Sequence, residues 1–380
     1  MIRPESRPKK IRARRTTVKV ADEKRLSALR EQIDGIDSKL LELISARAQC
    51  ASEVAEVKGG DADAVYYRPE REAQVLRAVK AANPGPLSDE EIARLFREIM
   101  SACLALEKPI TVAFLGPEGT FTQAAALKHF GHSAISAPLS AIDEVFREVA
   151  SGAANYGVVP VENSTEGVVN HTLDSFREST LSICGEVELR IHHHLLIGPN
   201  TRPDNITRVY SHPQSLAQCR KWLDAHLPNV ERVPLNSNAE AAKRVIGEWS
   251  SAAIAGEMAE TLYELTPLYQ NIEDEPDNAT RFLIIGREPV PPSGDDKSSI
   301  MVSVKNQPGA LYTLLEPFRK HGVDLTRVET RPSRTATWSY VFFIDFVGHS
   351  EDDNVRLALE EIAAVVAELR VLGSYPRAVL

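Results

Sequence analysis

An arginine lies inside a long hydrophobic stripe near the start of the chain. Apolar residues that alternate at spacings of three and four predict a long helix packed along a narrow stripe. The stripe runs through Leu26, Leu29, Ile33, Ile36, Leu40, Leu43, Arg47, Cys50, Val54 and Val57. A guanidinium cannot be desolvated there without an anion to pair with. No carboxylate shares the stripe, so Arg47 indicates either a bound anionic ligand or a carboxylate from another helix.

Two more cations are placed by the same helix. Residues 22–58 contain no proline and are expected to form one helix roughly 50 Å long. Lys58 lies about 20° from Arg47 around this helix, so both side chains face one groove. Arg30 lies about 25 Å from Arg47 along the axis, a distance that one small molecule cannot span. Arg30 would therefore reach a ligand of the same type only in a second copy of the chain, and we expect a dimer.

Two further helices are predicted before residue 109. One begins near Pro69, a favoured first-turn residue, and the other begins with a capping box formed by Ser88 and Glu91. Glu72 and Glu107 each extend an apolar face of these helices. The spacing therefore predicts an all-helical site in which buried cations and buried acids meet.

This segment resembles the helical chorismate mutases, in which three helices per chain interlock with those of a second chain. The resemblance is carried by Leu29-Arg30, by Ala46-Arg47-Ala48, by Lys58 and by the run from Arg68 to Glu72. It implies that Arg47 and an Arg30 from the second chain hold the two carboxylates of chorismate. The Claisen rearrangement needs this folded dianion and stabilised negative charge on the ether oxygen.

The resemblance also implies roles for the remaining residues of the mutase site. Lys58 and Glu107 would face the ether oxygen, and Glu72 would accept a hydrogen bond from the ring hydroxyl. Glu107 stands where other members have Gln, and it would have to be protonated to donate. Arg68 and Cys103 would complete the chorismate site at positions where some members have Asp and Ser.

Residues 109–288 alternate predicted strands and helices, and several turns between them are rich in short polar residues. These turns are Gly116–Phe121, Val159–Gly167, Ser211–Ser215 and Asn278–Phe282. The first lacks the G-x-G-x-x-G pattern, which argues against a dinucleotide site and favours an anion cradle at a helix start. Any one turn could be structural capping, but together they predict a cleft for a small, oxygen-rich anion. The run His192–His194 is not expected to bind a metal, because alternate strand residues face opposite sides.

These turns together resemble the prephenate dehydratases. The resemblance implies a two-lobed α/β fold like that of type-2 periplasmic binding proteins, with prephenate between the lobes and the last strand returning to the first lobe. Prephenate loses carbon dioxide and its ring hydroxide together, giving phenylpyruvate, and Thr280 would donate a hydrogen bond to the leaving oxygen. Arg281 would anchor a carboxylate, although strand alternation points it away from Thr280 and a structural salt bridge is an equal alternative. The other cleft residues implied are Asn163, Ser164, Thr165, Ser211 and Gln214.

Residues 298–380 read as strand, helix, strand, strand, helix and a short final strand, a βαββαβ ferredoxin-like order. The segment resembles the ACT domains, which bind amino-acid effectors and commonly do so between two copies. The alternative is a purely structural dimerisation module. The resemblance implies a phenylalanine site, and its residues would be Gly309, Ala310, Leu311, Glu329, Thr330 and Arg331.

The length and composition of the chain indicate how many domains it has and which classes of partner are excluded. Its 380 residues suit two or three domains, and the expected divisions are a basic, disordered leader (1–20), the mutase segment (21–108), the dehydratase segment (109–288), a linker (289–297) and the ACT segment (298–380). The leader carries eight basic residues and one acidic residue, and the remainder has a net charge of −16, which argues against nucleic acid. Four dispersed cysteines and no long apolar run predict a reduced, cytoplasmic protein without structural zinc or a membrane span.

Together the segments resemble the bifunctional chorismate mutase–prephenate dehydratase family under phenylalanine control, acting without a cofactor. Two alternatives remain open at this point. In one, the chain is a non-catalytic dimeric sensor of a small molecule. In the other, it is a dehydratase whose mutase segment is vestigial. The sequence does not decide whether dimers pair further, whether prephenate passes directly between sites, which group protonates the departing hydroxide, or what the basic leader does.

Overall fold

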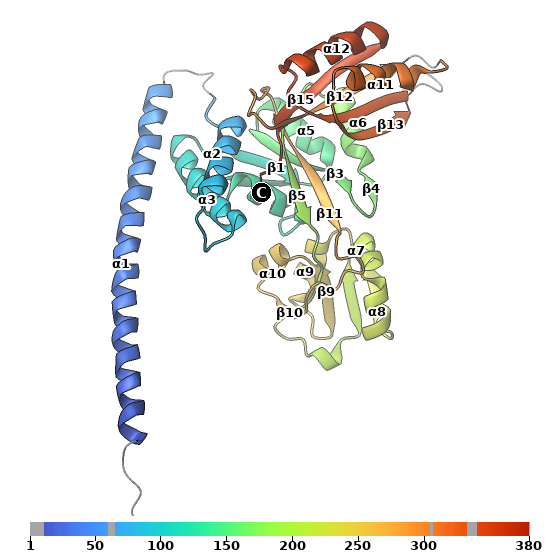
Figure 1. The fold of residues 1–380 in the computed structure, drawn as a ribbon. Coiled ribbons are helices and arrows are strands. Elements are labelled where there is room, and N and C mark those ends of the chain that lie inside the picture. Colours follow the sequence, from blue (N-terminus) through green and yellow to red (C-terminus); the bar gives the residue numbers. More distant parts are fainter. Residues whose placement is uncertain (1–10, 60–64, 305–306, 333–339, 380) are drawn as a thin grey trace, which may run out of the picture. The chain divides into compact units, whose positions relative to one another are not determined.

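The computed structural model describes residues 11–59, 65–304, 307–332 and 340–379, and of residues 11–21 only the backbone. The chain forms two units, residues 1–64 and residues 65–380. Helix α1 (Ile11–Lys58) belongs to the first unit, and the other elements of the described chain belong to the second (Figure 1). No helix in these described ranges is long and apolar enough to cross a bilayer.

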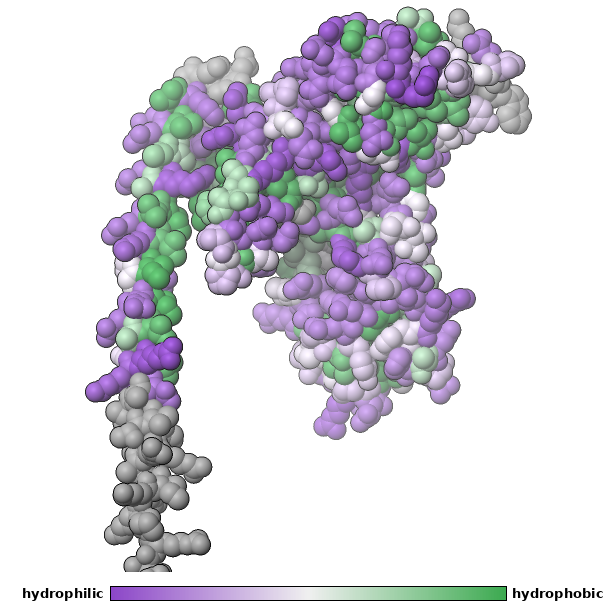
Figure 2. Space-filling view, viewed as in Figure 1, coloured by the Kyte–Doolittle hydropathy of each residue, from purple (hydrophilic) through white to green (hydrophobic). Residues whose placement is uncertain are grey.

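Helix α1 begins earlier than predicted. The leader was expected to be disordered through residue 20, but the helix already includes Ile11. Neither proline nor glycine occurs between Pro8 and Gly35, so nothing in this stretch stops a helix. The predicted apolar stripe lies exposed along α1 (Figure 2), with exposed fractions of 46% at Leu29 and 50% at Leu40.

Helices α2 (Pro69–Ala82) and α3 (Asp89–Glu107) begin where the sequence predicted. The Ser88 hydroxyl accepts from the backbone N–H of Glu91, but the Glu91 carboxylate pairs with Arg94 at 2.9 Å. Only half of the predicted capping box is therefore present. Just before α2, the buried Tyr67 ring packs against Phe130 and Tyr156 of the α/β domain, with centroid distances of 5.3 and 5.2 Å. This contact joins the start of α2 to the dehydratase core.

The first lobe of the α/β domain is a six-stranded sheet with three helices. Its elements are β1 (Thr111–Leu115), α4 (Phe121–Phe130), β2 (Ile135–Leu139), α5 (Ile142–Ser151), β3 (Tyr156–Asn163), β4 (Gly167–Val168), α6 (Asn170–Glu178), β5 (Ser182–Arg190) and β11 (Ala279–Gly286). The strand order is β2-β1-β3-β11-β5, with β4 paired to β3. Strand β11 enters from the second lobe and pairs antiparallel with both β3 and β5. The expectation that the last strand returns to the first lobe is confirmed.

The second lobe is a five-stranded sheet of order β10-β6-β9-β7-β8. Its elements are β6 (His194–Ile197), a 3₁₀ turn (Pro203–Asn205), β7 (Arg208–Ser211), α7 (Pro213–Gln218), α8 (Arg220–His226), β8 (Glu231–Pro234), α9 (Asn238–Val245), β9 (Ser251–Ala255), α10 (Glu257–Leu262) and β10 (Thr266–Tyr269). Between α7 and α8 the chain leaves the helical conformation at Cys219 (φ −109°, ψ 15°). The two-lobed α/β class is confirmed.

The C-terminal domain has the predicted βαββαβ order. Its elements are β12 (Asp296–Val304), α11 (Ala310–Lys320), β13 (Leu325–Pro332), β14 (Tyr340–Val347), α12 (Asp353–Val365) and β15 (Glu368–Pro376), and the sheet order is β13-β14-β12-β15. The final strand has nine residues and is not short.

The sheet of this domain is buried on both faces. One face packs against α11 and α12, through residues such as Phe342, Phe346 and Leu314. The other face shares one hydrophobic core with the first lobe of the α/β domain, through Met301, Phe343 and other residues. Two apolar faces are typical of a sheet that is covered on both sides, so the two domains form a continuous body.

Helix α2 also holds the linker that leads into this domain. The Arg77 guanidinium donates to the Ser293 carbonyl at 3.2 Å and to the Asp295 carbonyl at 2.6 Å. Lys80 Nζ donates to the Val379 carbonyl beyond β15, at 3.1 Å. The helical segment therefore contacts the C-terminal domain directly as well as through the chain.

Substituting Gly373 should loosen the contact between β15 and β5. A Cβ atom at this position would overlap the backbone of Ile183 on β5, and backbone cannot move aside as a flexible side-chain end can. We expect Gly373→Ala to destabilise the folded state by about 1–3 kcal/mol, as overpacking of a core does. The measurement is the thermal midpoint, followed by circular dichroism.

Gly247→Ala is the matched control, because nothing lies within 4 Å of a Cβ atom at that position. Its thermal midpoint should stay at the wild-type value. Equal midpoints for the two variants would contradict the packing assigned to Gly373.

Candidate active sites

Thr280 lies opposite Asn163 in the pairing of β11 with β3. Asn163 is buried and Thr280 is half-buried. The Asn163 Nδ2 group donates to Thr280 Oγ1 at 2.8 Å and to Asn278 Oδ1 at 2.8 Å. Two of the predicted prephenate residues are therefore brought together by neighbouring strands.

The orientation of the Asn163 amide is fixed by the turn that follows it. Its Oδ1 atom accepts from the backbone N–H groups of Thr165 and Glu166, each at 3.0 Å. A backbone N–H can only donate, so the opposite end of the amide must be the NH₂ group. Thr280 Oγ1 therefore accepts from Asn163, and the proton of the Thr280 hydroxyl stays available for another acceptor.

Ser164 and Thr165 complete this turn. The Ser164 hydroxyl accepts from the Ala279 N–H at 2.9 Å, and the Thr165 hydroxyl donates to Asn278 Oδ1 at 3.3 Å. Both residues are exposed. They connect the end of β3 to the start of β11, which holds Asn163 and Thr280 at a fixed separation.

The hydrogen bonds continue into the second lobe through residues that the sequence reasoning did not select. Asn278 Nδ2 donates to Gln218 Oε1 at 3.1 Å, and His193 Nε2 lies 2.8 Å from the same oxygen. Burial lowers the pKa of His193, although the hydrogen bond to Gln218 raises it in part, so the ring is neutral at pH 7 and carries its proton on Nε2. Asn278 lies in a polar turn already singled out and His193 in the histidine run, whereas Gln218 follows the turn Ser211–Ser215 and carried no signal of its own.

A cavity of about 320 Å³ opens beside this network. It is bounded by Thr165, Gln218 and Asn278 together with residues of both signs of charge. The cations at its wall are Arg220 and Lys221, which are exposed. The cavity is large enough for a small molecule, and four carboxylates (Glu166, Glu273, Asp274 and Glu275) line it together with the two cations.

Other predicted prephenate residues have different surroundings. Ser211 is fully buried, and its hydroxyl lies 2.8 Å from both Asn238 Oδ1 and the Ile254 carbonyl, so it stabilises the end of β7. Gln214 is half-buried at the start of α7, and its backbone N–H donates to His212 Nδ1.

Arg281 points to the opposite face of β11 from Thr280, as strand alternation requires. Its guanidinium pairs with Glu186 at 2.8 Å and with Asp345 at 2.6 Å. These contacts correct the assignment of Arg281 to the prephenate site and support the alternative of a structural salt bridge.

The first polar turn is closed by its own side chains. Gln123 Oε1 accepts from the Gly119 N–H at 2.6 Å, and the Thr120 hydroxyl caps α4. These contacts favour structural capping over the predicted anion cradle. Across the lobes, the Tyr263 hydroxyl donates to the Glu118 carbonyl at 3.1 Å.

The histidine run makes separate contacts. His192 pairs with Glu273 at 2.8 Å, His193 contacts Gln218, and His194 Nδ1 accepts from the Asn271 N–H. Within the described ranges, no group of three or more His, Cys, Asp or Glu residues is placed to hold a metal ion.

The predicted chorismate residues fall in both units of the chain. On α1, Arg30 and Arg47 are exposed and Lys58 is half-buried. In the second unit, Cys103 is buried and Glu107, the last residue of α3, is half-buried.

Two further residues of this group have charged partners. Arg68 lies 3.8 Å from Glu70. The Glu72 carboxylate lies 2.6 Å from Arg97 Nε, beside a small cavity of about 30 Å³ that Tyr67 and His129 also line. Glu72 therefore has a cationic partner on α3 that the sequence reasoning did not select.

The predicted effector residues lie on α11 and β13. Gly309 precedes α11 with φ +83°, a left-handed conformation that favours glycine, and it is followed by Ala310 and the exposed Leu311. On β13, an edge strand, Glu329 is half-buried and Thr330 is exposed.

Arg331 of β13 reaches the dehydratase domain. Its guanidinium donates to Asn170 Oδ1 at 2.9 Å and pairs with Asp174 at 3.1 Å. Arg331 thus contacts α6, and this contact must be separated from any contact with an effector.

Family models match three consecutive parts of the chain. Chorismate mutase type II matches residues 29–108, prephenate dehydratase matches 112–290, and the ACT domain matches 298–364. A bifunctional chorismate mutase/prephenate dehydratase of Pseudomonas aeruginosa is 67% identical over 365 residues, which are 95% of this chain and 100% of that protein. The chain belongs to the bifunctional chorismate mutase/prephenate dehydratase family.

Further relatives agree with the bifunctional family. A bifunctional chorismate mutase/prephenate dehydratase of Neisseria gonorrhoeae is 49% identical over 353 residues, covering 92% of this chain and 97% of that protein. The crystal structure of prephenate dehydratase from Arthrobacter aurescens in complex with L-Phe is similar, with a TM-score of 0.66 and 35% identity over 71% of this chain and 90% of that one. The chain accordingly joins an isomerase that converts chorismate to prephenate with a lyase that converts prephenate to phenylpyruvate.

The dehydratase reaction of this bifunctional enzyme should depend on the side-chain NH₂ group of Asn163, which donates to Thr280. Asn163→Asp keeps an oxygen for the two backbone N–H groups but replaces the NH₂ group with an acceptor. The Thr280 hydroxyl would then donate to the new carboxylate instead of to the substrate. We expect kcat for prephenate to fall about 100-fold or more, as on loss of a preorganised donor.

Asp277→Asn is the control for this measurement, because it removes only an exposed ion pair with Arg190 close to the same turn. It should leave kcat at the wild-type value. Near wild-type turnover by Asn163→Asp would show that Thr280 is not oriented in this way.

Proposed function

We propose that Thr280 donates a hydrogen bond to the departing ring hydroxyl of prephenate. The observation that supports this role is the orientation of Asn163, which makes Thr280 Oγ1 an acceptor and leaves its proton available. In the reaction, the bond to the carboxylate carbon breaks, its electron pair enters the ring, and the hydroxide leaves as the ring becomes aromatic. A threonine hydroxyl is too weak an acid to supply the proton itself at neutral pH. Thr280 therefore stabilises the leaving oxygen, and the proton comes from another donor.

We propose Asn163, Ser164, Thr165 and Gln214 as further prephenate contacts around the same cleft. The cavity beside Thr165 and Asn278 supports a site on this side of the network. Ser211 supports the site through the end of β7. Arg220 and Lys221 are the cations of this cavity that could pair with the carboxylates of prephenate, although Glu166, Glu273, Asp274 and Glu275 also border it and Lys221 lies 3.4 Å from Glu275.

We propose that the mutase site forms between two copies of the chain. Arg47 and Lys58 of one copy would bind chorismate together with Arg30 of the other, and Arg68, Glu72, Cys103 and Glu107 would line the same site. The exposed apolar stripe of α1 supports this proposal, because a stripe of this length needs a partner to cover it. We therefore also propose that the chain forms a homodimer, from which a higher oligomer could be built.

We propose that L-phenylalanine is the effector of this protein. We also propose that the chain acts in the cytoplasm. The Arthrobacter aurescens prephenate dehydratase is described in complex with L-Phe, and the matching ACT domain here packs against the dehydratase domain. The four cysteines are free thiols, as is usual in a reducing compartment.

Mixing two inactive variants tests the shared mutase site. Arg30→Ala and Arg47→Ala should each lose mutase activity on chorismate, because every site lacks one carboxylate contact. A mixed dimer has one site with both arginines and one with neither. After subunit exchange, an equal mixture should therefore regain about a quarter of the wild-type activity.

The two variants alone, each refolded in the same way, are the controls. If both variants are inactive and mixing restores nothing although the subunits exchange, Arg30 does not complete the site of the second chain. If neither substitution lowers activity, the mutase site lies elsewhere, and if the wild type converts prephenate alone, the mutase segment is vestigial.

Arg331 tests the effector site. Arg331→Ala should raise the phenylalanine concentration that halves dehydratase activity by about tenfold or more, the effect of losing one charged hydrogen bond. Asp174→Asn breaks the interdomain pair but keeps the arginine, and it should remain inhibited. Equal inhibition of Arg331→Ala and wild type would exclude effector binding by this residue.

A further inference from the structure

A chain of side-chain amides leads from the turn after β3 into the second lobe and ends on a histidine. Asn163 Nδ2 donates to Asn278 Oδ1 at 2.8 Å, and Asn278 Nδ2 lies 3.1 Å from Gln218 Oε1. The same Gln218 oxygen lies 2.8 Å from His193 Nε2. Asn163, Asn278 and His193 are buried, and Gln218 is half-buried. Buried polar groups need partners, so each donor in this chain must meet an acceptor.

The direction of every hydrogen bond in the chain follows from its first member. Two backbone N–H groups fix the orientation of Asn163, so its NH₂ group faces Asn278. The facing atom of Asn278 must then be its amide oxygen, and its other end must be its NH₂ group. That NH₂ group donates to Gln218, so the Gln218 atom at this contact is the oxygen. An amide oxygen can only accept, and His193 must therefore donate to it from Nε2.

The other ring nitrogen of His193 agrees with this assignment. Nδ1 is buried, and within the described ranges it has no hydrogen-bond partner. A proton on Nδ1 would be a buried donor without an acceptor, which is rare in folded proteins. Burial lowers the pKa of His193, although the hydrogen bond to Gln218 raises it in part. The ring is therefore neutral, and its single proton is on Nε2.

Both segments that connect the two lobes hold His193 in place. His193 lies between β5 and β6, where the chain first passes from the first lobe to the second. On the returning segment, Glu273 accepts from the His193 backbone N–H at 2.9 Å, and the Ile272 N–H donates to the His193 carbonyl at 2.8 Å. The ring packs edge to face against Phe121 of the first lobe, with centroids 5.7 Å apart. The Nε2 donor therefore has a fixed position at the junction of the lobes.

Two donors on one oxygen determine which end of Gln218 can meet a ligand. Gln218 borders the cavity of about 320 Å³ together with Thr165 and Asn278. Among the hydrogen bonds of the described residues, none has Gln218 Nε2 as its donor. The NH₂ group is therefore available to an oxygen of a molecule in the cavity. Prephenate, with two carboxylates, offers such acceptors.

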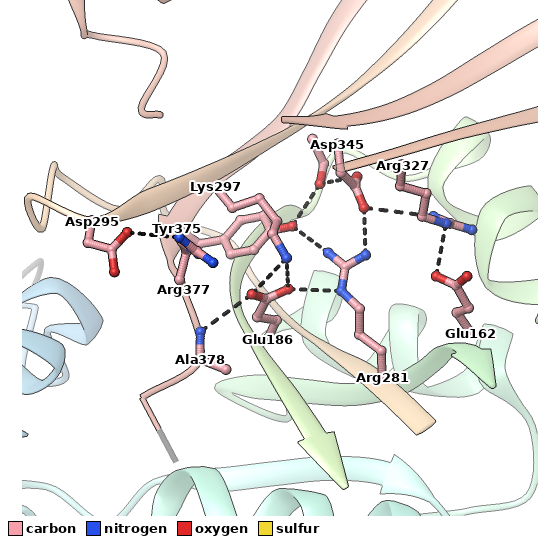
Figure 3. A network of polar contacts seen from close by, with 11 residues as sticks. Glu162, Glu186, Arg281, Asp295, Lys297, Arg327, Asp345, Tyr375, Arg377 and Ala378 are labelled. Atoms are coloured by element: carbon pink, nitrogen blue, oxygen red, sulfur yellow. Dashed lines mark hydrogen bonds and ion pairs between the residues drawn. The ribbon is translucent and has the colours of Figure 1, made fainter. Parts of the chain in front are cut away.

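The two charged side chains of β3 and β11 lie on the opposite face of the sheet from this amide chain. Arg281 pairs there with Glu186 and Asp345, and Glu162 pairs with Arg327 at 3.2 Å (Figure 3). Side chains alternate along a strand, so neither charged residue turns toward the cleft. The amide chain supplies neutral donors on the cleft side, and their orientation decides whether a donor or an acceptor meets the substrate.

We propose that His193 is a positioning residue for the dehydratase reaction, which fixes the side-chain amide of Gln218 so that its NH₂ group donates to an oxygen of prephenate. His193 acts through Gln218, and as a neutral ring it does not protonate the departing hydroxide. The alternative is that His193 only fills space between the lobes. This inference rests on the proposed prephenate site around Thr280.

Two substitutions of equal length at His193 separate these interpretations. His193→Gln keeps an NH₂ donor at about the position of Nε2, whereas His193→Met has no donor. Both variants lose the ring that packs against Phe121, so any loss of packing is common to both. In the full-length protein, kcat/KM for prephenate should fall about tenfold in His193→Met, the effect of one hydrogen bond. His193→Gln should recover most of this loss.

His192→Gln is the control at the neighbouring position, because it removes only a pair between a partly exposed histidine and Glu273. Its kcat/KM should equal that of the wild type. Thermal midpoints of all variants, followed by circular dichroism, show whether each one folds.

Substitutions of Gln218 test the second step of the proposal. Gln218→Glu keeps an acceptor for Asn278 and His193 but has no donor for the substrate, and its kcat/KM should fall about 100-fold or more. In a Gln218→Met background, adding His193→Met should cause no further loss, because His193 acts only through Gln218.

The outcomes separate this inference from the role of Thr280. If His193→Met keeps the wild-type kcat/KM, or if His193→Gln loses as much as His193→Met, the positioning role is excluded. A further loss on adding His193→Met to Gln218→Met would also overturn it. None of these results changes the role of Thr280, which Thr280→Val tests separately. If Thr280→Val keeps activity, the proposed chemistry of Thr280 fails whatever the His193 variants show.

Discussion

The antiparallel pairing of β11 with β3 and β5 is the constraint on which the rest of the dehydratase depends. Strand β11 is the last element to enter the first lobe, and it lies between β3 and β5, which end 116 and 89 residues before it begins. Its pairing fixes Thr280 opposite Asn163 and, one residue on, Arg281 opposite Glu162. A shift of register by one residue would exchange the two faces and move the hydroxyl out of the cleft.

The shared hydrophobic core gives this pairing a rigid support. The ACT sheet buries one face against its own helices and the other against the first lobe. Buried side chains of both domains fill the same space, so the ion pairs behind β3 and β11 lie at the edge of a packed core and not in a mobile contact. Such an interface differs from the polar, separable contacts that are usual between domains.

Local patterns predicted much of this protein, and long-range contacts account for what was missed. Thr280 and Asn163 lie in short polar turns that the sequence shows directly, and the βαββαβ order follows from hydrophobic periodicity. Gln218 and His193 were missed because their contacts join positions 60 and 25 residues apart. Strand alternation indicated that Arg281 turns away from the cleft, but its partner Asp345 lies in another domain. The apolar stripe of α1 was predicted from the spacing of its residues, whereas no local signal marked the start of this helix at Ile11.

The packing of Tyr67 determines where this chain can be divided. Family boundaries suggest a cut between α3 and β1, but Tyr67 belongs to the aromatic cluster with Phe130 and Tyr156. Arg97 of α3 also donates to the carbonyls at the end of α4. A fragment that begins at β1 would lose both contacts and expose the face that they cover. The natural point of division lies before Val65, so two of the three mutase helices are also part of the dehydratase scaffold.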